Sequence, residues 1–472
     1  IGRETMTGDE LKEAVGPCRP QLKALLDKGI LTCKTVEKYR DPYAQEVPTA
    51  PPDDNILSQA QKEALAQILA LYQTGQPKAA LLHGITGSGK TRVIKAAMDH
   101  VLSSGRQIIL LIPEISLTPQ TVGYFRACYG ERVAVIHSSL SNGERYDMWK
   151  RIRRGEVDIC IGTRSAIFAP FSNIGMIVID EEQEHTYKSD MSPRYHARDV
   201  ARFRCAQHNA LMLLASATPS IESYYKAKNG KYTLISLKER YGGATLPEVL
   251  IADQRKDARD GNTTSLGSIL RQELQLNLTS QEQSVLFLNR RGFHNYLSCP
   301  LCGNVVMCPH CSVSLTYHTR RSIHGGSTSY LACHWCGHLD AVPEVCPSCQ
   351  NPHLRYMGYG TQKAEEELHD CFPEARVIRM DADTTSSKAA YHNILETFRA
   401  GEADILLGTQ MVTKGHDFPN VTLSGVLAAD SMLYLDEYRA NERTFSMITQ
   451  VIGRAGLADK HGRAVIQTYN PD

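Results

Sequence analysis

Residues 84–91 form a glycine-rich loop that ends in a lysine and a threonine, with the sequence Gly-Ile-Thr-Gly-Ser-Gly-Lys-Thr. Glycines let backbone N–H groups close around a phosphate, and the start of a following helix adds partial positive charge there. An apolar run precedes this loop and helically spaced apolar residues follow it, which is the context that a phosphate-binding loop requires. The loop therefore predicts binding of ATP through Gly84, Gly87, Ser88, Gly89, Lys90 and Thr91.

The other side chains of the predicted nucleotide site each have a distinct role. Lys90 would reach the β- and γ-phosphates, and the hydroxyl of Thr91 would bind Mg²⁺. A second apolar run ends in Asp180 and Glu181 downstream of the loop, so we predict that Asp180 holds Mg²⁺ and Glu181 orients or deprotonates the attacking water. Gln61 precedes the loop, where it could recognise the adenine edge or simply face solvent on a helix.

Eight of the 14 cysteines fall into four Cys-x-x-Cys pairs, while the other six are scattered. Each pair is half of a tetrahedral thiolate site, so four pairs predict two Zn²⁺ ions in a reducing compartment. An iron–sulfur cluster is the alternative that the pattern leaves open. The predicted ligands are Cys299, Cys302, Cys308, Cys311, Cys333, Cys336, Cys346 and Cys349.

We expect these pairs to bind the two ions in a nested order, because a chain that goes out and returns brings its outer pairs together. Cys299 and Cys302 would then bind one ion together with Cys346 and Cys349. The four cysteines between them in the sequence would bind the other ion. His310, His334 and His338 are expected to be bystanders, since four thiolates per ion are already present.

A mixture of aromatic and basic residues follows the acids directly, between residues 187 and 198. Aromatic rings stack on unpaired bases while cations pair with phosphates, so this segment predicts contact with a single-stranded nucleic acid. A plain surface loop is the alternative. The residues concerned are Tyr187, Lys188, Arg194, Tyr195 and Arg198.

The positions of these groups require an α/β fold. Short apolar strands alternate with helical segments twice along the chain, before and after the cysteines, which predicts two doubly wound parallel sheets. A chain of 472 residues exceeds what one core usually supports. The expected boundaries are 1–40 (a partial winged helix), 41–56 (a proline-rich linker), 57–235 (lobe 1), 236–297 with 353–472 (lobe 2) and 298–352 (the zinc insertion).

Composition excludes several classes of protein. Hydrophobic residues make up 42% and charged residues 22% of the chain, as in ordinary globular proteins, and the net charge is +1. No apolar run is long enough to span a membrane, and no secretory leader is present, so we expect a cytoplasmic protein without membrane contact. Because the chain begins at Ile1 rather than Met, we expect it to be part of a longer protein.

Further motifs occur in the order typical of superfamily 2 helicases. They are residues 113–120 (motif Ia), 162–170 (Ib), 216–219 (III), 287–293 (IV), 408–418 (V) and 450–456 (VI). Three strings are more specific: His-Ser-Ser-Leu at 137–140, Gly-Thr-Arg-Ser-Ala at 162–166 and Lys-Gly-His-Asp-Phe-Pro at 414–419. Together with the eight-cysteine insertion, they resemble the PriA family of replication-restart helicases from Leu57 to the end of the chain.

This resemblance implies two RecA-like lobes with ATP between them and 3′-to-5′ unwinding of forked DNA at stalled replication forks. It implies single-stranded and forked DNA, other primosome and replication-restart proteins, single-stranded-DNA-binding protein and the loader of the replicative helicase as partners. By its motifs, Arg454 would contact the γ-phosphate, Gly415 and Asp417 the nucleotide, and Arg164 and Arg290 the DNA.

Two positions depart from the family pattern. Gln183 stands where the family has a histidine that can bridge to motif III, and Leu457 stands where motif VI usually ends in arginine. These departures leave two other functions open. One is a translocase that remodels protein–DNA complexes without unwinding, and the other is a zinc-stapled DNA-binding adaptor with weak ATPase activity.

Overall fold

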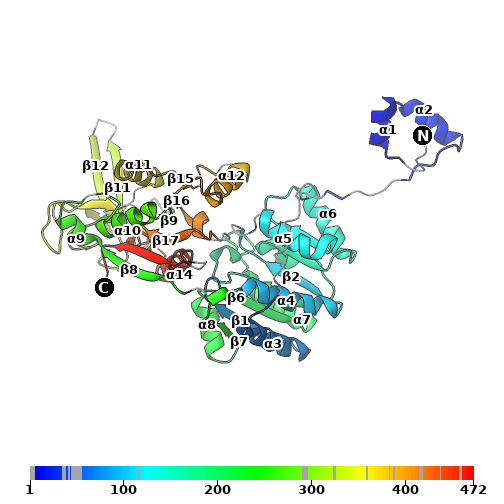
Figure 1. Cartoon of the computed structure of the whole chain (residues 1–472), viewed down its shortest axis with the longest axis horizontal. Coiled ribbons are helices and arrows are strands. Elements are labelled where there is room, and N and C mark those ends of the chain that lie inside the picture. Colours follow the sequence, from blue (N-terminus) through cyan, green and yellow to red (C-terminus); the bar gives the residue numbers. More distant parts are fainter. Residues whose placement is uncertain are drawn as a thin grey trace.

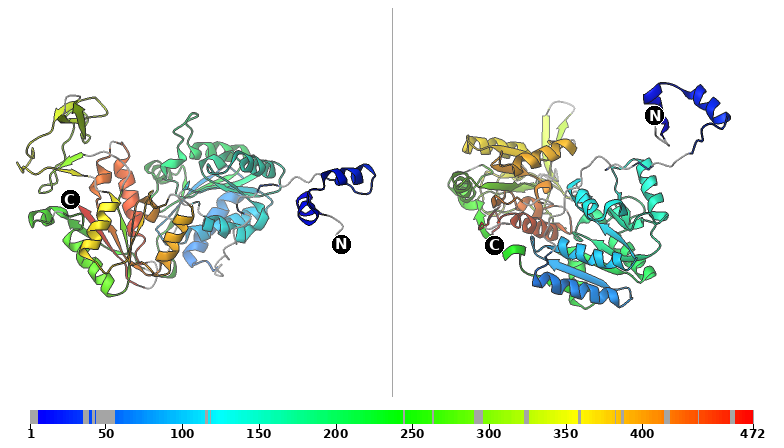
Figure 2. Two further views of the ribbon diagram at one scale, coloured as in Figure 1. Left: turned by 90° about the horizontal axis from the view of Figure 1, so that it is seen from above. Right: turned by 45° about the vertical axis from the view of Figure 1, so that its right-hand side comes forward.

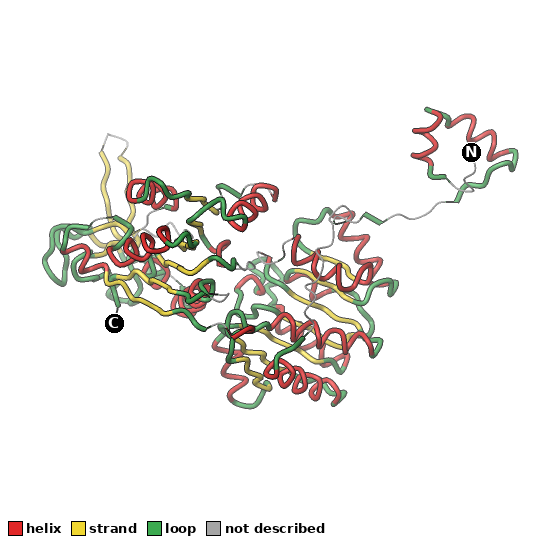
Figure 3. Tube along the Cα trace, in the orientation of Figure 1, coloured by secondary structure: helices red, strands yellow, loops and turns green. Residues whose placement is uncertain are grey.

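The computed structural model describes residues 6–34, 39–40, 43, 56–114, 117, 119–243, 245–262, 264–289, 296–322, 326–357, 360–381, 383–385, 388–413, 418–435, 437–456 and 460–471. Within these ranges, two lobes lie side by side, and helices flank the strands of each (Figures 1 and 3). None of the helices described there is long and apolar enough to cross a membrane. The helices α1 (Gly8–Val15) and α2 (Arg19–Asp27) stand apart from both lobes in every view (Figure 2).

Lobe 1 is built on a sheet of seven strands, and every strand runs parallel to its neighbours. In spatial order these are β3 (Val133–Ile136), β4 (Ile159–Gly162), β2 (Gln107–Leu111), β5 (Ile174–Ile179), β6 (Leu211–Ser216), β1 (Ala79–Gly84) and β7 (Thr233–Leu237). Both faces of the sheet are covered, which explains why its strands read as continuous apolar runs. The first lobe thus extends to residue 237, two residues past the expected boundary.

Alternate residues of these strands enter two separate cores. One core joins the sheet to α3 (Gln59–Gln73), α4 (Lys90–Ser103) and α5 (Pro119–Tyr129). The other joins it to α6 (Asn142–Arg153), α7 (Ala197–His208) and α8 (Ile221–Lys228). Short 3₁₀ turns η2 (Gly130–Arg132), η3 (Arg164–Phe168), η4 (His185–Tyr187) and η5 (Tyr241–Gly243) complete the connections.

Lobe 2 repeats this plan with a parallel sheet of six strands. In spatial order these are β15 (Val377–Met380), β16 (Ile405–Gly408), β9 (Gln283–Phe287), β17 (Val421–Val426), β18 (Arg463–Thr468) and β8 (Glu248–Asp253). Its helices are α9 (Gln254–Arg259), α10 (Ser268–Thr279), α11 (Thr361–Cys371), α12 (Lys388–Arg399), α13 (Asp430–Leu433) and α14 (Ala440–Ile452), with the 3₁₀ turn η6 (Gln410–Thr413). The fold class predicted from the sequence is confirmed for both lobes.

The zinc insertion has an antiparallel sheet of five strands of its own. These are β13 (Leu339–Ala341), β12 (Gly326–Ala332), β11 (Thr316–Ser322), β10 (Tyr296–Ser298) and β14 (Arg355–Met357). The chain was expected to return to lobe 2 at residue 353, but β14 still pairs with β10 of the insertion sheet. The polar stretch after residue 253 begins with α9.

The segment before lobe 1 rests on α6. The Tyr43 hydroxyl lies 2.6 Å from His137 Nε2, and Tyr39 donates a hydrogen bond to Glu156 at 2.9 Å. Arg40 pairs with Asp147 at 3.6 Å. Residues 1–40 were expected to form a partial winged helix, and their described part contains the helices α1 and α2 but no strand over residues 28–34.

Candidate functional site

The phosphate-binding loop connects β1 to α4, as the sequence requires. Gly87 and Gly89 have positive φ angles of 80° and 76°, a backbone conformation that favours glycine. A Cβ atom on Gly84 would lie 2.6 Å from Ser88 Oγ, and one on Gly89 would lie 2.3 Å from Gln61 Nε2. Side chains at these positions would therefore distort the loop. Lys90 begins α4, and its ammonium donates to the Gly84 carbonyl oxygen at 2.8 Å.

Gln61, at the start of α3, contacts this loop. Its side chain is buried and completes a capping box with Ser58 at the start of α3. The amide nitrogen donates a hydrogen bond to the Ser88 carbonyl oxygen at 2.9 Å. The expectation of a solvent-facing glutamine is therefore wrong, and contact with adenine stays a prediction.

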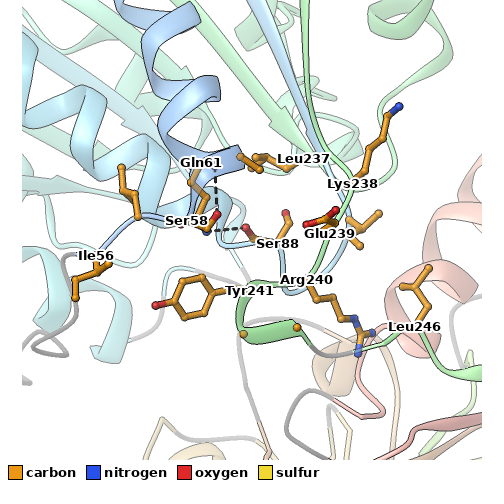
Figure 4. A pocket seen from close by; sticks show the side chains of 15 residues that line it. Ile56, Ser58, Gln61, Ser88, Leu237, Lys238, Glu239, Arg240, Tyr241 and Leu246 are labelled. Atoms are coloured by element: carbon orange, nitrogen blue, oxygen red, sulfur yellow. Dashed lines mark hydrogen bonds between the residues drawn. The ribbon is translucent and has the colours of Figure 1, made fainter.

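A pocket of about 650 Å³ lies beside the loop, between the start of α3 and residues 237–246 (Figure 4). The ring of Tyr241 forms one wall, and the Arg92 guanidinium lies 4.0 Å above it. The Tyr241 N–H donates to the Gly87 carbonyl oxygen at 2.8 Å, which fixes this wall to the phosphate-binding loop. A half-apolar cavity attached to the phosphate cradle is suited to a purine base.

The acidic residues follow β5 at the carboxyl edge of the sheet. Glu181 has a positive φ of 46°, an uncommon conformation for a residue other than glycine. Its carboxylate accepts a hydrogen bond from the Gln183 amide at 2.6 Å, and Gln183 in turn accepts one from the Ser216 hydroxyl at 2.6 Å. Gln183 therefore makes the bridge to motif III that the family's histidine was expected to make.

Lobe 2 reaches this site through α14 and the turn that follows it. The Gln450 amide donates to Glu181 at 3.3 Å. A Cβ atom on Gly453 would lie 2.6 Å from Thr86 Cβ, so motif VI packs directly on the phosphate-binding loop. Burial lowers the pKa of Lys90, and the nearby cation of Arg454 lowers it further, whereas Glu181 and Asp180 raise it. The groups predicted to act on ATP are thus brought together from both lobes.

Arg240 connects the end of lobe 1 to the same turn, and no sequence motif indicated this role. Its buried guanidinium donates to the carbonyl oxygens of Ala455 and Gly456 at 3.1 and 2.7 Å, and to that of Gly453 at 3.2 Å. A cation at the carboxyl end of a helix is favourable for the helix dipole as well. Arg240 therefore holds in place the turn that carries Arg454.

The structure corrects two of the predicted DNA contacts. Tyr187 is only 1% exposed, and its hydroxyl donates to the carbonyl oxygens of Asp180 and Leu111 at 2.6 and 3.1 Å. Arg198 is buried as well, and its guanidinium pairs with Glu182 at 2.9 Å and donates to the Ser220 and Ser223 hydroxyls. Both side chains are committed to the interior of lobe 1, so neither offers a face or a charge to DNA.

Three other predicted DNA residues shape the loop rather than project from it. Arg164 donates to the carbonyl oxygens of Thr186, at 3.0 Å, and Lys188. The Lys188 ammonium donates to the Arg194 carbonyl oxygen at 2.6 Å. The Tyr195 ring is half-buried and meets Phe168 edge-on at 4.9 Å. Phe168 is 53% exposed, so it presents a larger aromatic surface than Tyr195 does. Phe168 lies in motif Ib, but the sequence indicated no role for it.

Some predicted residues lie outside the part of the chain that the structure describes. Gly415, Asp417 and Arg290 are among them, and so is the departure at Leu457. Their roles stay predictions.

The eight cysteines form two groups of four in the nested order. Cys299, Cys302, Cys346 and Cys349 make one group, and Cys308, Cys311, Cys333 and Cys336 make the other, with all thiol sulfur atoms of a group within 4.8 Å of one another. The sulfur–sulfur distance is 3.5 Å between Cys299 and Cys349, 3.7 Å between Cys302 and Cys346, and 3.6 Å between Cys308 and Cys336. Tetrahedral Zn–S bonds of about 2.3 Å place sulfur atoms about 3.8 Å apart, so each group fits a zinc ion.

All four Cys-x-x-Cys turns share one backbone geometry. In each, the residue after the second cysteine has a positive φ and donates its N–H to the carbonyl oxygen of the first cysteine. These residues are Gly303, Ser312, Gly337 and Gln350. His310 and His338 pack against each other instead of joining a sulfur group, as expected of bystanders.

Residues 58–227 match the family model described as DEAD/DEAH box helicase. The chain is 48% identical over 450 residues to the replication restart protein PriA of Bacillus subtilis, covering 95% of this chain and 55% of that protein. It is 42% identical to PriA of Synechocystis sp., covering 100% of this chain and 56% of that one, and 40% identical to PriA of Haemophilus influenzae, covering 95% and 60%.

The chain therefore spans a little over half the length of these curated relatives. Among solved structures, RecG bound to a three-way DNA junction covers 95% of this chain and 44% of that chain, at a TM-score of 0.48 and 16% identity.

A phosphate-binding loop in one parallel-sheet lobe, faced by an arginine motif on the other, is the arrangement of a two-lobed nucleotide-binding protein of the helicase class. The relatives and the paired cysteine groups narrow this class. Over nearly its whole length, the chain is similar to the PriA family of replication restart proteins.

Proposed function

We propose that this chain is the motor of an ATP-dependent DNA helicase that restarts stalled replication forks. The observation that carries the proposal is the contact between Glu181 of lobe 1 and Gln450 of lobe 2, beside the packing of Gly453 on Thr86. The contact lets a change at the γ-phosphate alter the fit between the lobes. A motor needs that link to convert hydrolysis into movement.

Each group around the nucleotide has a defined task in this proposal. The loop at 84–89 binds the phosphates through backbone N–H groups, and Lys90 and Arg454 stabilise the charge that develops on the γ-phosphate. Thr91 and Asp180 would hold Mg²⁺, which neutralises phosphate charge when bound. Glu181 orients the attacking water and accepts its proton, and the Tyr241 pocket receives the adenine.

DNA would contact the carboxyl edge of lobe 1 beside Phe168 and Tyr195. Because Arg164 ties this region to the carbonyl oxygens of Thr186 and Lys188, a shift of the loop moves residues that follow Glu181 closely. We propose movement along single-stranded DNA in the 3′-to-5′ direction, which rests on the family alone. Arg290 and Arg194 are proposed as further contacts.

The zinc insertion would help to separate the strands of forked DNA and would offer a surface to other proteins. It holds two Zn²⁺ ions in this proposal, and its ligands favour zinc because each group consists of four thiols in a closed arrangement. The proposed partners are other primosome proteins, single-stranded-DNA-binding protein and the loader of the replicative helicase. Such a protein would act in the cytoplasm.

The experiment that tests this function measures ATP turnover and strand separation on the same forked DNA. The proposal expects DNA-stimulated hydrolysis and unwinding, both lost in Lys90→Ala. Hydrolysis without unwinding would favour a translocase that remodels protein–DNA complexes. DNA binding with little hydrolysis would favour the zinc-stapled adaptor, whose support is reduced because Gln183 makes the motif III bridge.

A further inference from the structure

One side of α6 carries an exposed row of aromatic and basic residues that the nucleotide site does not use. Members three or four residues apart lie on the same side of the helix, and the row includes no acid. They are Arg145, Tyr146, Trp149, Lys150 and Arg153, hereafter the α6 row. Tyr146 is 56% and Trp149 is 37% exposed, and the chain contains only two tryptophans.

The fold does not need this row for packing. α6 packs on the sheet through Met148 and Ile152, which are buried in the second core. The segment before lobe 1 occupies a different side of the helix, where Arg40 meets Asp147 and the Tyr39 ring lies 5.9 Å from the Arg151 guanidinium. Among the described residues, no acid forms an ion pair with Arg145 or Arg153.

The rings and cations of the α6 row are aligned with one another. The Tyr146 and Trp149 rings are nearly parallel, with an interplanar angle of 7° and centroids 6.4 Å apart. The Lys150 ammonium lies 4.7 Å from the Tyr146 ring centre, and the Arg153 guanidinium lies 5.0 Å from that of Trp149. Parallel rings flanked by cations match the alternation of base and phosphate along a single strand.

The place of α6 in lobe 1 connects it to the proposed DNA path. α6 follows β3, the edge strand, whose neighbour β4 leads into η3 and therefore into Phe168. Because all strands are parallel, the ends of β3 and β4 lie at the same edge of the sheet. A strand that passes Phe168 and Tyr195 can continue across this edge to the start of the α6 row.

We propose that the α6 row is a second binding site for single-stranded DNA, separate from the contacts beside the catalytic acids. The site rests on the proposed function in one respect, since it lengthens the DNA path of the motor. It would anchor the strand rather than stimulate hydrolysis. It favours nucleic acid over an acidic peptide because two large stacking faces accompany the charge.

The test uses Trp149 as its own reporter. In the full chain with Trp335→Phe, Trp149 is the remaining tryptophan, and its fluorescence is titrated with oligothymidylate without nucleotide. We expect strong quenching. The double variant Tyr146→Ala/Trp149→Ala, measured by anisotropy of labelled oligothymidylate, should bind at least about tenfold more weakly. The matched control Tyr225→Ala, an exposed tyrosine on α8, should bind normally.

Charge gives a second measurement. Each phosphate neutralised contributes about −0.7 to the slope of log affinity against log salt for single strands, so Arg145→Glu/Arg153→Glu should reduce the slope by about 1.4. Unchanged Trp149 fluorescence, an unchanged slope, or quenching by polyglutamate but not by oligothymidylate would overturn the proposal. ATP turnover at saturating DNA should be normal in all these variants. A wild-type chain that lacks DNA-stimulated turnover would instead contradict the proposed function, whatever the fluorescence shows.

Discussion

The carboxylate of Glu181 in lobe 1 accepts a hydrogen bond from the amide of Gln450 in lobe 2, at 3.3 Å. This contact joins the residue proposed to direct the attacking water to the helix that carries the arginine motif. It predicts that lobe closure and the position of the water depend on each other.

Gln450→Ala should lower kcat by about tenfold or more while leaving the KM for ATP nearly unchanged. The reason is that Gln450 contacts Glu181 and lies away from the pocket at Tyr241 that would bind the base. Steady-state turnover at saturating DNA gives both constants. Equal changes in KM and kcat would show that Gln450 acts on nucleotide binding instead.

Gln183→His should retain most of the wild-type rate, whereas Gln183→Ala should lose it. Gln183 connects Glu181 to Ser216, and a histidine can span the same two groups with one donor and one acceptor nitrogen. Unfolding temperatures of both variants serve as the control for damage to the fold. A slow Gln183→His with normal stability would show that the bridge needs an amide.

Arg240→Ala should uncouple the lobes more than it weakens ATP binding. The variant removes three hydrogen bonds to the carbonyl oxygens of Gly453, Ala455 and Gly456, so Arg454 loses its fixed position. We expect a lower kcat, a smaller stimulation by DNA and an affinity for ATP within about threefold of the wild type. Arg240→Lys should restore part of the rate, since one cation remains near the turn.

Arg198→Ala should reduce stability rather than DNA affinity. Removing this partner leaves the buried Glu182 carboxylate without its counter-ion, a loss of about 3–5 kcal/mol in the free energy of unfolding. Denaturant unfolding measures the change. The paired replacement Arg198→Met/Glu182→Leu should regain much of the stability, because it removes both charges. A specific DNA defect in a stable Arg198→Ala protein would contradict this assignment.

His196 should make lobe 1 sensitive to acid. Burial lowers the pKa of His196 to about 4, helped by the Arg198 cation, and its Nδ1 accepts the Arg198 N–H at 3.1 Å as the cap of α7. The unfolded chain therefore binds the proton first as the pH falls, so stability is complete above about 6.5 and decreases between 6.5 and 4.

The comparison for this prediction is His196→Asn, which keeps a capping acceptor but has no proton to gain. Its unfolding temperature should vary less with pH across this window than that of the wild type. Identical pH profiles for the two proteins would show that His196 does not contribute.

The sequence predicted most strands of both lobes. Parallel strands that are buried on both faces consist of apolar residues, and the motifs mark where these apolar runs end. It missed β8, whose Val249 and Ile251 are exposed on an edge strand and therefore lack a two-sided apolar pattern. It also placed Tyr187 in contact with DNA. The burial of that ring depends on the carbonyl oxygen of Leu111, 76 residues away in sequence, which no local pattern can indicate.

The candidate site also contains some residues that the sequence could predict and others that it could not. Types and spacing identified the groups on the phosphate-binding loop and the eight cysteines. They could not identify Arg240, because a single arginine after a strand gains its role only when motif VI folds back beside it. Phe168 likewise stood in a quoted motif, but its exposure and its contact with Tyr195 depend on how η3 meets the loop after residue 187.

The zinc insertion contacts residues that follow it in the sequence and are therefore synthesised later. Ser314 donates to the Tyr434 carbonyl oxygen at 2.8 Å, and the Gly303 turn lies against Tyr469, so a Cβ atom on Gly303 would be 2.3 Å from the Tyr469 carbonyl oxygen. During synthesis, all eight thiols leave the ribosome before either tyrosine does. In a nascent chain, the insertion can therefore bind its metal ions and fold first. The strand β18 of lobe 2 would then pack against an insertion that has already folded.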